Sequence, residues 1–166
     1  SLHDALPIFV MAKEILKSSA CRSASQPAKS PSHHLPKAAI AAWRLPDRGI
    51  WEVRGEPRHF TSSKLYGWVA LDRGARLARV RGEDDLAEAW AAETAAIRAD
   101  LEANGVDARG VFTQSYGAAA LDASALLMPL LGFLPPDDPR IRATVLAVAD
   151  ELTENGLVLR YRTETA

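Results

Sequence analysis

The chain has 166 residues, of which 25% are charged, and its formal net charge is −1. This length is enough for one domain with a hydrophobic core, and the balanced charge gives no general field for binding nucleic acid or an anionic membrane. No apolar run approaches the roughly 18 residues of a membrane span. The single cysteine, Cys21, excludes an intramolecular disulfide and fits a reducing compartment. We therefore expect a cytoplasmic protein with no nucleic-acid or membrane partner.

The first 35 residues lack the pattern of a folded domain. Residues 18–36 are rich in Ser, Ala and Pro and show no apolar periodicity, which is typical of a disordered linker. We expect residues 1–35 to be a disordered or unrelated leader and residues 36–166 to be the folded part. His33 and His34 have no further metal ligands in range, so we expect no metal and no cofactor.

Five later segments are predicted to be helical, from apolar periodicity near 3.6 or from a long apolar run. They are residues 37–44, 62–80, 83–104, 121–131 and 139–154. Lys64 is expected on the polar side of its helix, with Leu77 inward, and Val145 is expected inward in the last helix. The run 121–131 is expected to be buried on all sides. Long helices with short connections and no strand pairs predict an all-α fold of helical hairpins.

The loop between the first two helices holds the strongest candidate for chemistry. Glu52 follows Trp51 directly, in a stretch that two glycines and two prolines break. An indole offers a flat apolar surface to a sugar ring, and it desolvates the neighbouring carboxyl, which favours the proton-donating form. Arg58 and His59 are candidate donors to sugar hydroxyls. These residue types together predict a carbohydrate site with an acid catalyst.

Each candidate also has a structural alternative. Glu52 could pair with an arginine in a surface loop, and Trp51 could belong to the core. Either Arg58 or His59 could instead be a structural partner of Glu56 or Asp72. Asp122 could line the pocket, or its carboxylate could cap the helix that follows.

Two blocks of the sequence resemble glycoside hydrolase family 15. The first, from Asp47 to about Arg79, contains DRGIWEVRGEPRHFTSSKLYGWVALDRGARLA. The second, from Phe112 to Arg140, reads FTQSYGAAALDASALLMPLLGFLPPDDPR. The two blocks follow the family's order, and the resemblance extends from Trp43 onward. It implies an (α/α)6 toroid that hydrolyses α-glucosidic bonds with inversion, as in glucoamylases and bacterial trehalases.

The resemblance also implies roles and an extent. The glutamate after the tryptophan is the family's general acid, which maps onto Glu52. Twelve helices of about 11–12 residues each, with loops, exceed this length, so we expect residues 36–166 to be a partial catalytic domain whose general base lies outside the chain. The expected substrate is trehalose, maltose or a short α-glucan. The alternative is a non-catalytic helical module that binds sugar or a protein.

Overall fold

The computed structural model describes residues 33–52 and 55–162. The elements in order are α2 (His34–Ala42), α3 (Thr61–Val80), α4 (Asp84–Asn104), the 3-10 helix η2 (Ala123–Leu126), α5 (Leu127–Leu131), α6 (Pro139–Glu151), β1 (Thr153–Glu154) and β2 (Leu157–Val158). The predicted all-α class is confirmed. Within the described ranges, no helix has the length and apolarity that a membrane crossing requires.

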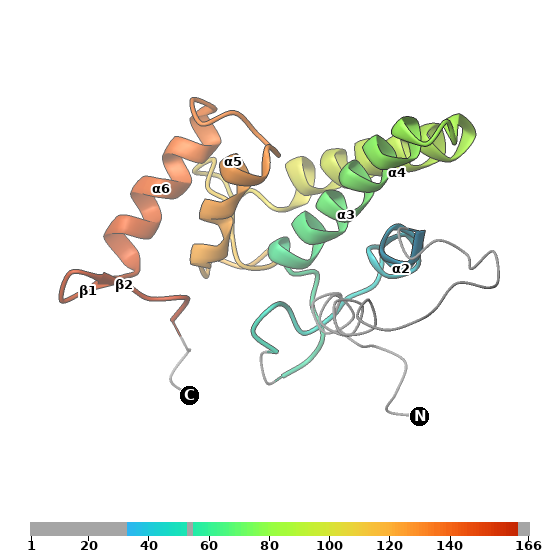
Figure 1. Ribbon diagram of the computed structural model, residues 1–166. Helices are drawn as coiled ribbons and strands as arrows, with labels where there is room; N and C mark the ends of the chain where they lie inside the picture. The colour runs from blue at the N-terminus through green and yellow to red at the C-terminus, as the bar shows by residue number, and fades with distance from the viewer. Residues whose placement is uncertain (1–32, 53–54, 163–166) are drawn as a thin grey trace, which may run out of the picture.

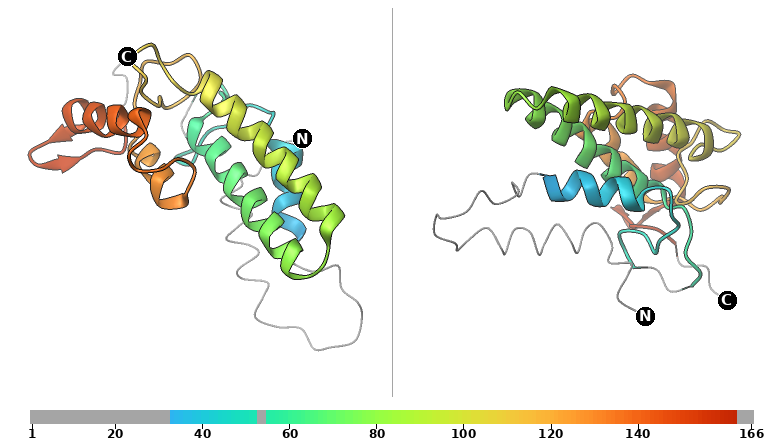
Figure 2. Two further views of the ribbon diagram at one scale, coloured as in Figure 1. Left: turned by 90° about the horizontal axis from the view of Figure 1, so that it is seen from above. Right: turned by 90° about the vertical axis from the view of Figure 1, so that its right-hand side faces the viewer.

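The centre of the fold is the hairpin of α3 and α4, with α2 packed along α3 (Figures 1 and 2). Both long helices bury an apolar stripe that includes Trp68, Trp90 and Ile97. Gly74 allows α2 to come close, because a Cβ at this position would lie 2.5 Å from Cγ of Pro36. The predicted boundaries of the two long helices are each within one residue of those observed.

The prediction that Lys64 lies on the polar side of α3 is wrong. Lys64 is only 1% exposed, and its ammonium donates hydrogen bonds to the carbonyl oxygens of Trp43 and Leu45, the latter at 2.8 Å. It lies four residues before Trp68, and therefore on the same buried face. Burial lowers the pKa of Lys64, although the charge of Asp47 favours the ammonium. This side chain fastens the end of α2 to the start of α3.

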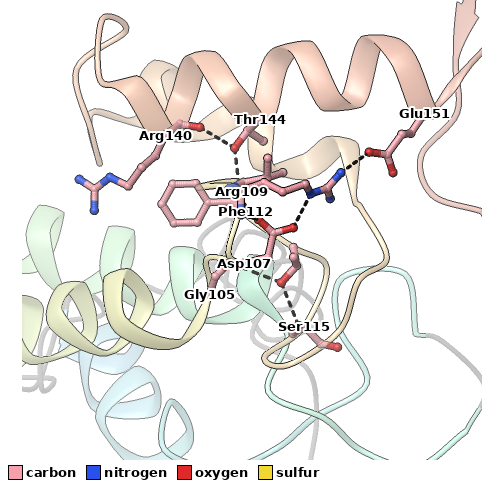
Figure 3. Close-up of polar contacts among 10 residues, drawn as sticks. Gly105, Asp107, Arg109, Phe112, Ser115, Arg140, Thr144 and Glu151 are labelled. Carbon is pink, nitrogen blue, oxygen red and sulfur yellow. Dashed lines mark hydrogen bonds and ion pairs between the residues drawn. The ribbon is translucent and has the colours of Figure 1, made fainter.

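The connection between α4 and α6 is held by backbone and side-chain hydrogen bonds (Figure 3). The buried hydroxyl of Thr144 accepts a bond from the backbone N–H of Phe112 at 3.0 Å and donates to the carbonyl of Arg140 at 2.7 Å. The guanidinium of Arg109 donates to Glu151, at the end of α6, at 2.6 Å. These contacts fix α6 relative to the α3–α4 hairpin.

The segment 121–131 is not the fully buried helix that was predicted. It divides into η2 and α5, and Leu130 is 81% exposed. A continuous helix would need Pro129 to donate to the carbonyl of Ala125, which proline cannot do. Leu77 and Val145, both expected inward, are 43% and 45% exposed. Apolar residues at helical spacing therefore identify one face of a helix, but the other described residues do not bury every position on that face.

The last predicted helix ends three residues early, and a strand pair follows that was not predicted. β1 and β2 pair antiparallel around Asn155 and Gly156, whose φ angles are 50° and 80°. Positive φ at both central residues fits a two-residue type I′ turn, for which Asn-Gly is the preferred sequence. Asn155 and Gly156 are therefore the turn of a short hairpin.

Candidate functional site

The predicted acid lies in a loop that is closed at its base. Asp47 and Arg58 exchange two backbone N–H···O bonds, each of 2.8 Å. The guanidinium of Arg48 braces the loop by donating to the carbonyl of Gly55 at 2.5 Å. These bonds join the two ends of the loop and tie Gly55 to its first half.

Side-chain contacts fasten this loop to the start of α3. The Asp47 carboxylate accepts bonds from the Gly49 amide at 2.6 Å and from the Ser63 hydroxyl at 2.8 Å. Gly49 has a φ of +70°, and a Cβ there would lie 2.9 Å from the Phe60 ring. Only glycine meets both conditions. These contacts anchor the first part of the loop to the start of α3.

Glu52 lies on the exposed side of this loop. Its backbone N–H donates to the carbonyl of Gly49 at 3.2 Å, and its φ is +50°. Left-handed backbone is uncommon for a residue with a Cβ, and such residues cluster at functional sites. The side chain is exposed, so a ligand can reach its carboxyl group. Arg54, one of the cations close to it in sequence, lies outside the described residues.

Trp51 is half-buried and is contacted by two segments far away in sequence. Its indole Nε1–H donates to Oδ2 of Asp122 at 3.0 Å. The guanidinium carbon of Arg160 lies 4.9 Å from the ring centroid, within cation–π range. A backbone bond of 2.8 Å from Ala123 to the carbonyl of Arg160 fixes that segment. Sequence reasoning missed Arg160, whose only signal is an arginine that follows a short apolar run.

Asp122 is 3% exposed, and both of its carboxylate oxygens accept hydrogen bonds. Oδ1 accepts from the Ser124 amide at 2.8 Å, so the capping contact considered for Asp122 is present, at the start of η2. Burial raises the pKa of Asp122, and the bonds from Ser124 and Trp51 oppose that rise. Burial and the Asp122 charge together raise the pKa of Tyr66 on α3.

Arg58 and His59 differ in how free their side chains are. The Arg58 side chain is exposed and makes no hydrogen bond or ion pair with the residues that the structure describes. The His59 ring stacks on Tyr116 at a centroid distance of 5.7 Å, and Tyr116 donates to Asp100 at 2.7 Å. Asp72, considered as a partner of either residue, pairs with two arginines of its own helix.

A hollow of about 430 Å³ lies elsewhere, between residues 120–121 and the end of α6. It is lined in part by Asp150, Glu151 and Arg162, and neither Trp51 nor Glu52 belongs to its lining. Across residues 33–52 and 55–162, no group of three or more His, Cys, Asp or Glu side chains could hold a metal ion. The candidate site is the Trp51–Glu52 loop, because it presents an exposed carboxyl group next to an indole held by Asp122 and Arg160.

The chain belongs to glycosyl hydrolases family 15, whose family model matches residues 32–166. The resemblance of the two sequence blocks is thereby confirmed.

The chain is similar to proteins described as trehalases. It is 68% identical over 124 residues to that of Mycobacterium tuberculosis and 68% over 126 residues to that of Mycolicibacterium smegmatis. These matches cover 75% and 76% of the chain, but only 18% and 19% of the relatives. The chain thus spans about a fifth of the length of the curated relatives that it matches.

A solved structure of a glycosidase in complex with glucose is similar in fold. It is 25% identical, with a TM-score of 0.67, and the match covers 76% of this chain and 34% of that one. The helical hairpins described above therefore fit a part of a helical toroid, as the resemblance implied.

Proposed function

We propose that this chain is part of the catalytic domain of an inverting α-glucosidase, and that Glu52 is its general acid. The observation that carries the proposal is the pair Trp51 and Glu52 in a chain of family 15, with the carboxyl exposed beside a held indole. The backbone bonds of Asp47, Gly49 and Glu52 support it, because an acid must be held in reach of the bond that it protonates.

In the proposed reaction, a glucose ring packs on Trp51. Glu52 gives its proton to the glycosidic oxygen as the bond to the anomeric carbon breaks. Water attacks that carbon from the opposite face, and a second carboxylate, about 6.5–9.5 Å from the acid, takes a proton from the water. Asp122 is unsuited to this second role, because it is buried and both oxygens are engaged. We assign the base to a residue outside this chain.

We propose trehalose as the substrate, ahead of maltose and short α-glucans. The names of the two mycobacterial relatives, at 68% identity, support this choice. The exposed Arg58 guanidinium and the His59 ring are the proposed donors to sugar hydroxyls. The single cysteine in the sequence supports a cytoplasmic location.

The test uses a complete enzyme in which the part of this chain that aligns with the M. tuberculosis trehalase replaces the corresponding segment of that protein. Glu52→Gln keeps the size of the side chain and removes the proton. We expect kcat for trehalose to fall by about 10²–10⁴-fold with substrate binding largely intact, since only the transition state uses the proton. The loss should shrink for α-glucosyl fluoride, whose leaving group needs no protonation. Glu56→Gln, in the same loop and exposed, is the matched control.

Equal losses on both substrates, or a rise in KM alone, would make Glu52 a binding residue. A folded chimera that binds sugar without hydrolysing it would favour the non-catalytic module instead.

A further inference from the structure

The Trp51 indole is held from two sides by residues that are distant in sequence. Asp122, 71 residues later, accepts its N–H, and Arg160 lies over its face. The base of the loop is closed separately, by the backbone bonds of Asp47 and Arg58. The contacts to the indole are therefore not needed to close the loop. They act on its middle part, which carries Glu52.

Asp122 is poorly placed to bind a sugar directly. It is 3% exposed, one oxygen caps η2 through Ser124, and the other accepts from the indole. A buried carboxylate whose two oxygens both accept hydrogen bonds fixes the orientation of the groups that donate to it. One of those donors is the indole of Trp51, which directly precedes the proposed acid Glu52.

We propose that Asp122 is a positioning residue for the general acid, which holds the edge of the Trp51 indole and thereby fixes the direction of the Glu52 side chain. The proposal rests on the proposed function of Glu52. One peptide unit joins the two residues, so a shift of Trp51 would also move the backbone from which the Glu52 side chain extends, and that backbone has a φ of +50°. A misplacement of about 1 Å at a reacting group can cost about 100-fold in rate.

The capping and positioning roles of Asp122 can be separated in the chimeric enzyme. Asp122→Ser retains a good helix cap but is too short to reach the indole. Trp51→Phe keeps a ring and removes the N–H, without touching the cap. Asp137→Asn, at an exposed aspartate outside the site, is the control. Circular dichroism verifies that each variant is folded, and Trp51→Phe alone still tests the proposal if Asp122→Ser does not fold.

We expect Asp122→Ser to lower kcat for trehalose by about 10- to 100-fold, with KM changed less than about threefold. The loss should be smaller for α-glucosyl fluoride, because that substrate does not need the acid. In the double variant the two losses should not multiply, since both remove the same contact. A purely structural role would lower the rate for both substrates alike.

Besides equal losses on both substrates, three results would overturn the proposal. They are independent, multiplying losses; a loss no greater than that of Asp137→Asn; and a rise in KM at unchanged kcat, which would mean direct sugar contact by Asp122. Glu52→Gln in the same assay separates the two claims. If that variant shows the selective loss and Asp122→Ser does not, only the positioning role fails.

Discussion

Replacing Lys64 with methionine should destabilise the protein although it removes a buried charge. Methionine keeps the length and the apolar stem of the side chain but leaves the carbonyls of Trp43 and Leu45 without their donor. Two hydrogen bonds from a charged donor are worth about 1.5–3 kcal/mol each. The cost of burying the ammonium, which is what lowers the pKa of Lys64, offsets part of that sum. We expect a net loss of about 2–3 kcal/mol, in the range typical of a broken buried network.

The assay is urea unfolding of the 166-residue chain, followed by circular dichroism. Lys37→Met is the matched control, since Lys37 is exposed on α2 and its replacement should change the free energy of unfolding by less than about 0.5 kcal/mol.

The pH dependence gives a second measurement. Because the pKa of Lys64 is lower in the folded state, the folded protein binds that proton less tightly than the unfolded chain. Stability therefore rises with pH between the folded pKa and the ordinary value of 10.5. The advantage of the native chain over Lys64→Met should be larger at about pH 9.5 than at pH 7. If Lys64→Met is as stable as Lys37→Met at both pH values, the hydrogen bonds of Lys64 do not stabilise the folded chain.

Two further predictions concern the helices. Gly74→Ala should destabilise the chain by about 1–3 kcal/mol, because the new Cβ would overpack against Pro36. Gly67→Ala is the control and should be neutral or slightly stabilising, because its new Cβ would make only ordinary contacts at 3.5 Å and beyond. Thermal melts of both variants check this. Asp138→Asn keeps the cap of α6 but loses the pairing with Arg140, which lowers the pKa of Asp138 to about 2. The stability that the Asp138 carboxylate adds over Asn is present above pH 3.8, its ordinary pKa, and should be lost as the pH falls through about 2. If the unfolding curves of the two proteins stay separate below that pH, the pairing of Asp138 with Arg140 is not the source of the difference.

The helices could be predicted from sequence because their apolar period is a local property. Glu52 and Trp51 could be singled out for the same reason, as neighbours in a loop with clear breaking residues. What surrounds them could not, because the contacts of Asp122 and Arg160 with the indole depend on how distant segments fold together. The charge of Lys64 predicts an exposed side chain, whereas its position on the apolar face of α3 buries it. That position, four residues before Trp68, was the available signal.

The contacts around Trp51 also determine when the site can form. Local contacts form early in folding, and pairings between distant segments must first overcome the entropy of closing long loops. The contacts of the α3–α4 hairpin are local and can form early, whereas the hydrogen-bond partner of the indole, Asp122, lies 71 residues later in the chain. At synthesis rates of about 5–20 residues per second, that separation corresponds to ~4–14 s on the ribosome. We therefore expect the acid loop to leave the ribosome closed at its base but unheld at Trp51, and to reach its final geometry only after the segment with Arg160 has been made.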